Sequence, residues 1–199
     1  MKTPFFIFIV FSTLSLSIGQ NPDPVLDLTG STVRSALRYY VIPAIRGNGG
    51  GVKLAPTTIN QTCPLDVVQE NNELLNGLPL TFLPTNTNKD GTIFESTDLN
   101  IKFSDATTCG RPAVWRVEVS GGQRVVSSRG MVGNPGQETI SNWFKIEKYE
   151  DGYKVTFCPS VCNTCRPACA DIGSTIAKNG RRSLVLNNVP LKVVFKKAD

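Results

Sequence analysis

The residues with the most reactive chemistry in this chain are six cysteines, and four of them fall within a twelve-residue segment. They are Cys63, Cys109, Cys158, Cys162, Cys165 and Cys169. On one continuous helix the last four could bind zinc or an iron–sulfur cluster. Pro159 and Pro167 interrupt that segment, and proline disfavours a helix interior. A metal cluster is therefore the weaker reading.

Cys162 and Cys165 also have the two-residue spacing of a thioredoxin-like redox pair. That chemistry needs a βαβ context, which the surrounding sequence does not provide. An even number of cysteines in an exported chain is typical of structural disulfides. We therefore expect three bridges, no free thiol and no cofactor or metal.

Six cysteines allow fifteen pairings. Proximity along the chain favours Cys63–Cys109 as the long bridge, with Cys158–Cys169 enclosing Cys162–Cys165. Loop-closure entropy grows with loop length, so the long bridge should contribute about 4 kcal/mol and the outer bridge of the pair about 3 kcal/mol. The inner bridge closes too short a loop to add much.

The first nineteen residues resemble a secretory leader. Lys2 is their only charge, residues 5–11 are almost all apolar, and Ser17 and Gly19 suit a cleavage site. The apolar run is too short for a stable membrane span. We expect residues 1–19 to be a signal peptide and residues 20–199 to form a single exported domain, with no membrane attachment once the leader is removed.

The absence of histidine excludes several classes of activity. There can be no Ser-His or Cys-His catalytic unit and no histidine-ligated metal. No pair of carboxylates stands out for glycoside hydrolysis. The net charge is +5, or +4 without Lys2, and the basic residues are scattered rather than gathered on a nucleic-acid-binding face. We expect neither an enzyme nor a nucleic-acid-binding protein.

The elements that must position these residues are short and β-rich. Turn signals such as Asp90-Gly91 and Asn179-Gly180 separate them, and residues 147–153 and 178–181 have the pattern of hairpins. About eleven or twelve strands are expected in an all-β barrel or sandwich. The expected strands are residues 39–42, 65–69, 80–83, 92–95, 99–103, 114–119, 124–127, 143–148, 153–157, 183–186 and 191–195.

Stretches along the whole chain resemble the plant Kunitz family, named for soybean trypsin inhibitor, in its miraculin-like branch. They include VLDLTG from Val25, CPLDVVQENNEL from Cys63, STDLNIKF from Ser96, GNPGQETISNWFKIEKY from Gly133 and the cysteine-rich block from Phe157. The resemblance implies a β-trefoil, in which a six-stranded barrel is capped by three hairpins with pseudo-threefold symmetry. The nested third disulfide is typical of the miraculin-like branch.

The resemblance also implies a function. Similar proteins inhibit secreted serine endopeptidases through an exposed, substrate-like loop, and serve in plant defence or storage. We therefore expect a monomeric inhibitor that is extracellular or vacuolar, with a secreted or digestive serine protease as its partner. The alternative is a non-inhibitory miraculin-like binding, defence or storage protein on the same fold.

The inhibitory loop corresponds to Thr87, Asn88, Lys89 and Asp90. Counting back from the STDLNIKF stretch puts Lys89 at the scissile position and Asp90 after it, whereas counting forward from Cys63 puts Thr87 there. A scissile lysine would suit a protease with an acidic specificity pocket. The two counts disagree by two residues, so both positions remain open.

This loop also has a purely structural interpretation, and its expected support departs from the family pattern. Asn88-Lys89-Asp90-Gly91 is also favourable tight-turn chemistry. The family commonly braces the loop with an asparagine from the N-terminal segment, and Ser35 stands at the matching position.

Three further features have simpler interpretations. Asn60-Gln61-Thr62 is a glycosylation sequon, and we expect Asn60 to be modified in an exported chain. Arg181 and Arg182 could form a second protease-facing site, although a solvated hairpin tip is the commoner arrangement. The two tryptophans, Trp115 and Trp143, are expected in the core.

Overall fold

The computed structural model describes residues 22–57 and 62–199, so the expected leader and Asn60 lie outside the described residues. Within this part of the chain there are twelve strands and one 3-10 helix, and no helix there is long and apolar enough to cross a membrane. The elements are β1 (Tyr39–Pro43), β2 (Val52–Pro56), β3 (Leu65–Gln69), β4 (Leu80–Pro84), β5 (Leu99–Phe103), β6 (Arg116–Ser120), β7 (Gln123–Ser127), η1 (Gln137–Asn142), β8 (Lys145–Tyr149), β9 (Gly152–Phe157), β10 (Ala170–Ile176), β11 (Arg182–Asn187) and β12 (Val193–Lys197).

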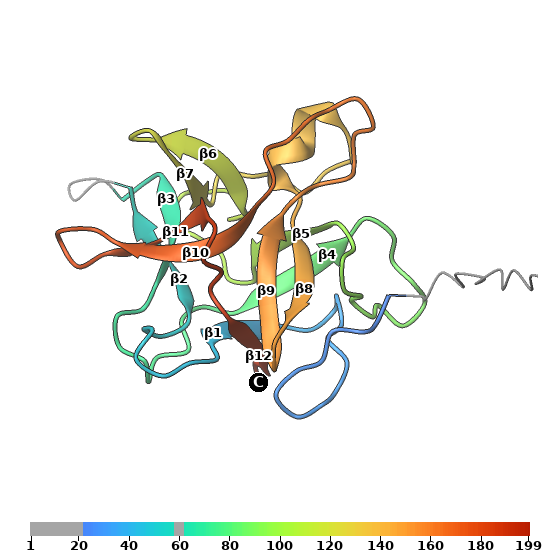
Figure 1. The fold of residues 1–199 in the computed structure, drawn as a ribbon, viewed down its shortest axis with the longest axis horizontal. Helices are drawn as coiled ribbons and strands as arrows, with labels where there is room; N and C mark the ends of the chain where they lie inside the picture. Colours follow the sequence, from blue (N-terminus) through green and yellow to red (C-terminus); the bar gives the residue numbers. More distant parts are fainter. Residues whose placement is uncertain (1–21, 58–61) are drawn as a thin grey trace, which may run out of the picture.

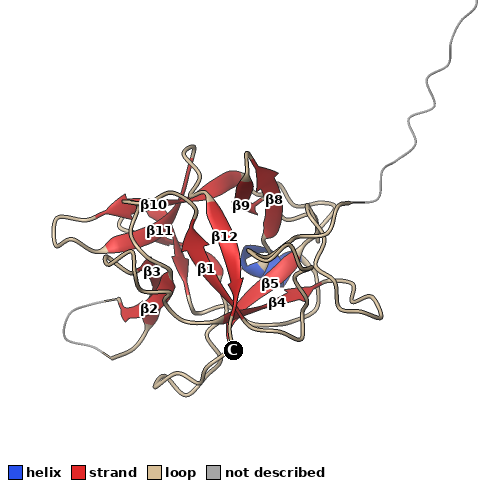
Figure 2. Ribbon diagram, turned by 90° about the horizontal axis from the view of Figure 1, so that it is seen from below, coloured by secondary structure: helices blue, strands red, loops and turns tan. Residues whose placement is uncertain are grey.

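Six strands close into a barrel. Antiparallel pairing runs from β9 to β12, β1, β4 and β5, and β8 pairs with β9. The ring closes between β5 and the segment that enters β8, where Leu99 forms a bridge with Phe144. Figure 2 shows β1 and β12 side by side in this barrel.

The other six strands form three hairpins, which are β2–β3, β6–β7 and β10–β11. One strand of each hairpin pairs with the other two hairpins, through β3–β7, β7–β11 and β11–β3 contacts. The hairpins therefore cover one side of the barrel, as Figure 1 shows on its left. Barrel strand, hairpin and barrel strand repeat three times along the chain, which is the β-trefoil expected from the resemblance.

The core is built from apolar side chains that alternate along these strands. Phe82 and Phe195 are fully buried and meet edge to face with ring centroids 5.4 Å apart. Trp115 packs in the same way on Phe144, at 5.8 Å. Such aromatic pairs add favourable contacts to the area that they bury. Both tryptophans are buried, as expected from the sequence.

The strand expectations are largely correct. The strands expected at residues 65–69 and 99–103 have the observed bounds, and both expected hairpins form. The strand expected at residues 92–95 is wrong, because these residues form only isolated bridges to the N-terminal segment. Strand β2 was not expected, and β10 was expected only as the first arm of the hairpin at residues 178–181, since proline ends the first and Gly173 interrupts the second, and both residues weaken a strand pattern.

Three disulfides join Cys63 to Cys109, Cys158 to Cys169 and Cys162 to Cys165, which is the pairing expected from the sequence. The long bridge ties the entry of β3 to the segment before β6. The two nested bridges both lie in the connection between β9 and β10.

Candidate functional site

The connection between β4 and β5 leaves the barrel and returns along the N-terminal segment. Its returning part is held on both sides, because Val25 N donates to Ile93 O and Ile93 N donates to Val33 O, each at 2.9 Å. Ile93 itself is fully buried. In Figure 1 this connection, in green, lies beside the first described residues, in blue. We call residues 85–91, which extend beyond this anchor, the projecting loop.

The projecting loop is exposed at its tip and attached at its first residue. Asn86, Thr87, Asn88, Lys89 and Asp90 are all exposed. Thr85 N donates a 3.0 Å hydrogen bond to Asp98 O at the entry of β5. One side of the loop is therefore fixed while its side chains face solvent.

Asp98 connects this attachment to the cysteine-rich block. Its buried carboxylate accepts hydrogen bonds from Ser160 N, at 3.2 Å to each oxygen, and from Ser160 Oγ. Ser160 lies inside the loop that the Cys158–Cys169 bridge closes. Hydrogen bonds to a charged group are stronger than neutral ones. The nested disulfides thus support a segment that holds the base of the projecting loop.

Lys89 and Asp90 lie at the crest of a tight turn. Gly91 N donates to Asn88 O at 3.1 Å, and Thr92 N donates to Asn88 Oδ1 at 2.8 Å. Gly91 has φ of 65°, a conformation that glycine adopts without strain. Thr87 and Asn88 precede the turn and lie in neither a turn nor a bend. The turn that the sequence offered as an alternative is present.

Ser35 lies against the far side of the loop, at the place where the family's bracing residue was expected. Its N donates a 2.8 Å hydrogen bond to Gly91 O. A Cβ added at Gly91 would lie 2.8 Å from Ser35 Oγ, closer than real side chains approach. The brace from the N-terminal segment therefore acts through the backbone of Ser35, and a side chain at Gly91 would have to displace the Ser35 hydroxyl.

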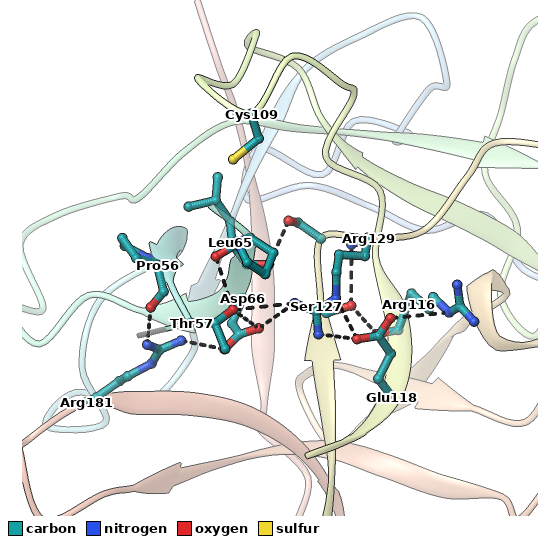
Figure 3. A network of polar contacts seen from close by, with 12 residues as sticks. Pro56, Thr57, Leu65, Asp66, Cys109, Arg116, Glu118, Ser127, Arg129 and Arg181 are labelled. Atoms are coloured by element: carbon teal, nitrogen blue, oxygen red, sulfur yellow. Dashed lines mark hydrogen bonds and ion pairs between the residues drawn. The ribbon is translucent and has the colours of Figure 1, made fainter. Parts of the chain in front are cut away.

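Arg181 and Arg182 are not available as a second protease-facing pair. Arg181 donates to Pro56 O and forms a 2.8 Å ion pair with Asp66. Asp66 also pairs with Arg129 at 3.5 Å, so the network in Figure 3 links the three capping hairpins. Arg182 packs its side chain against Gly49. Arg181 thus joins hairpins of the cap, and Arg182 lies beside the segment before β2.

Comparisons with known proteins match this chain over most of its length. Residues 25–197 match the family model described as trypsin and protease inhibitor. Kunitz trypsin inhibitor 5 of Arabidopsis thaliana is 42% identical, over 88% of this chain and 86% of that protein. Miraculin of Synsepalum dulcificum is 43% identical, over 88% of this chain and 84% of that protein.

A solved structure also matches. It is a Kunitz-type cysteine protease inhibitor from potato, 37% identical, with a TM-score of 0.77 over 90% of this chain and 99% of that chain. Proteins of this family are inhibitors and not enzymes, and they are generally secreted or vacuolar. From the extent of these matches, the chain belongs to the plant Kunitz family of protease inhibitors, in which miraculin is one of its relatives.

Proposed function

We propose that the protein inhibits a serine endopeptidase by presenting its projecting loop as a substrate. The observation that carries the proposal is that the loop has an exposed tip and is hydrogen-bonded to the body on both sides, through Thr85 and Gly91. A loop that is already held loses little conformational freedom on binding, so more of the contact energy appears as affinity.

The proposed mode of action depends on the same attachments. A protease that cleaves a free peptide releases both ends, whereas here each new end would stay bound to the body. The reverse reaction then competes with release, and the protease remains occupied. The family name and the trypsin inhibitor relative support this mode of action.

The proposal includes the processing of the chain. Residues 1–19 are removed as a signal peptide, residues 20–199 form one domain, and Asn60 carries a glycan. The mature protein acts as a monomer in the extracellular space or the vacuole, where it contributes to defence or storage. Mass spectrometry of the protein purified from its source tissue tests the leader and the glycan together.

A titration against a protease panel tests the inhibitory function. The panel contains trypsin, chymotrypsin, elastase, subtilisin and papain, and papain is included because the potato relative is a cysteine protease inhibitor. The loop variant replaces residues 86–90 by glycine and serine at constant length. Its matched control makes the same kind of replacement at residues 177–180, an exposed hairpin turn.

We expect the wild type and the hairpin control to inhibit at least one serine protease of the panel. The loop variant should lose that inhibition and stay folded, with a small loss of melting temperature from the hydrogen bond between Thr92 and Asn88, because the replaced side chains are exposed. A wild type that leaves every protease active would instead favour the non-inhibitory binding role seen as the alternative.

A further inference from the structure

We propose that the bond presented to the protease is Thr87–Asn88, that Asn88 braces it from within the loop, and that the target has an uncharged specificity pocket. Such pockets belong to elastase-like or subtilisin-like serine endopeptidases rather than to trypsin. This inference rests on the proposed inhibitory function and names the target class for the same loop.

Lys89 is in the wrong conformation to be the scissile residue. A protease cleft binds its substrate as an extended strand that pairs with the edge of the cleft. The Lys89–Asp90 bond instead lies at the centre of the turn closed by Gly91 N and Asn88 O. Extending it would break this hydrogen bond and the one from Thr92 N to Asn88 Oδ1. The preorganisation that favours binding would then be lost.

The Thr87–Asn88 bond avoids this cost. It lies between the bend at Thr85 and Asn86 and the turn at Lys89 and Asp90, and both of its residues are exposed. On its amino side, Thr85 N is held by Asp98 O. A cleft can therefore reach this bond while the turn behind it stays intact.

Asn88 supplies a brace on the other side of that bond. Its side chain accepts from Thr92 N, its carbonyl accepts from Gly91 N, and Gly91 O accepts from Ser35 N. These three hydrogen bonds attach the residue after the scissile bond to the body. The expected bracing asparagine is absent from the N-terminal segment, where Ser35 stands, and Asn88 provides an amide from inside the loop.

The chemistry on the bound protease is then reversible. The serine Oγ of the protease attacks the carbonyl carbon of Thr87 and forms an ester, the bond to the Asn88 nitrogen breaks, and a proton passes to that nitrogen through the protease's general base. The new amine of Asn88 remains in place because of its hydrogen bonds. It attacks the ester, the peptide bond re-forms, and the serine recovers its proton, so the cycle consumes no water.

The side chain at the scissile position determines the class of protease. Thr87 is small, β-branched and uncharged, and both of its neighbours are asparagines. It has no cation for the carboxylate at the base of a trypsin-like pocket, so that carboxylate would be buried without a partner. A shallow uncharged pocket accepts it without that penalty.

Inhibition constants of the wild type and two variants test the position. We expect the wild type to inhibit elastase or subtilisin, and Lys89→Ala, which changes a flanking contact rather than the anchor, to weaken that inhibition by no more than about tenfold. Thr87→Arg should create or strengthen trypsin inhibition by about a hundredfold, through the new charge pair in the acidic pocket. Melting temperatures of the variants verify that the fold is intact.

The brace has its own test, which measures cleavage rather than stability. Each inhibitor is incubated with the protease, and mass spectrometry follows the fraction cut at Thr87–Asn88. Asn88→Ala loses the hydrogen bond from Thr92 N, and we expect cleavage about tenfold faster than in the wild type. Asn88→Asp keeps the acceptor oxygen and should resist cleavage as the wild type does.

Three results would contradict the inference in whole or in part, and they separate it from the proposed function. If the wild type inhibits trypsin and Lys89→Ala removes that inhibition while Thr87→Arg changes nothing, the loop is inhibitory but Lys89 is its anchor. If the wild type inhibits no protease, the proposed function fails together with the inference. Equal cleavage of Asn88→Ala and Asn88→Asp would reject the brace alone.

Discussion

At the scale of single residues, Asp98 supports the site from beneath. Its backbone carbonyl holds Thr85 of the projecting loop, and its carboxylate holds Ser160 of the cysteine-rich block. Neither contact is apparent in the sequence, because Asp98 and Ser160 are 62 residues apart. Sequence reasoning missed this residue, although the STDLNIKF stretch that includes it was recognised.

The first prediction concerns this carboxylate. Asp98→Ala should lower the free energy of unfolding by about 2 kcal/mol, since hydrogen bonds to a charged group are lost and Ser160 keeps an unsatisfied donor. Urea denaturation measures the change. Asp105→Ala, at an exposed position, is the matched control and should cost less than about 0.5 kcal/mol. Equal losses in the two variants would show that Asp98 carries no special role.

The second prediction concerns the pH dependence of stability at Asp27. Its burial alone raises the pKa, but hydrogen bonds from Thr29 and Ser31 and the charge of Lys197 outweigh burial and hold the pKa below its usual value. A carboxyl group whose pKa is lowered by folding stabilises the protein at pH values above its pKa in the unfolded chain, which is about 4 for aspartate. This contribution is lost as the pH falls through the folded pKa.

Asp27→Asn isolates the charge, because the three local hydrogen bonds end on Oδ1, which asparagine retains. The melting temperature of the wild type should exceed that of the variant at neutral pH. The difference should shrink as the pH falls below about 4. A difference that stays constant over this range would assign the effect to geometry rather than to charge.

At the scale of elements, the connections differ in how closely they are packed. A Cβ added at Gly51 would overlap the backbone carbonyl of Asn76, where the segments before β2 and before β4 cross. Gly136, just before η1, has no atom within 4 Å of such a Cβ. The two glycines therefore differ in packing, which composition alone does not reveal.

The third prediction compares alanine at these two positions. Gly51→Ala should cost about 2 kcal/mol or more of unfolding free energy, because a backbone carbonyl cannot move aside as a flexible side chain would. Gly136→Ala should change stability by less than about 0.5 kcal/mol. Chemical denaturation of both variants measures the difference, and similar losses at both positions would contradict the packing argument.

The sequence predicts most barrel strands because each has apolar residues on its inward face and ends at a turn signal. It does not predict how the β4–β5 connection is held. Residues 92–95 have the pattern of a strand, and their alternation arises because Ile93 is buried between Val25 and Val33 of the N-terminal segment. A local pattern reports burial and cannot identify the distant partner that causes it.

At the scale of the whole molecule, three disulfides close loops of very different length. The long bridge closes 46 residues, the outer nested bridge 11 and the inner bridge 3. Loop-closure entropy therefore ranks their contributions in that order. The pairing could be predicted from order along the chain, whereas the support that the nested pair gives to Asp98 could not.

The fourth prediction is this order of stability. Replacing Cys63 and Cys109 together by serine should cost about 4 kcal/mol, and replacing Cys158 and Cys169 about 3 kcal/mol. Replacing Cys162 and Cys165 should cost less than about 2 kcal/mol. Urea denaturation of the three double variants measures the series. An inner bridge that contributes most would contradict the entropic ranking.

For the candidate site the sequence predicts a segment rather than a single residue, and that segment stays a prediction. The resemblance identified Thr87 to Asp90, and two ways of counting left Thr87 and Lys89 both open. The choice between them depends on the hydrogen bonds that Gly91 N and Thr92 N donate to Asn88. These bonds put the Lys89–Asp90 bond at the centre of a turn, whereas the Thr87–Asn88 bond lies before it. Turn chemistry in the sequence indicated such a turn, but not its relation to the brace at Ser35.

The central claim is that the projecting loop inhibits a serine endopeptidase, and the inhibition constant of the loop variant tests it most directly. The wild type, the variant with residues 86–90 replaced and the control with residues 177–180 replaced are titrated against elastase, subtilisin and trypsin. The account predicts inhibition by the wild type and the control, with a loss of at least about thirtyfold in the loop variant. Undiminished inhibition by a correctly folded loop variant, or none by the wild type, would contradict it.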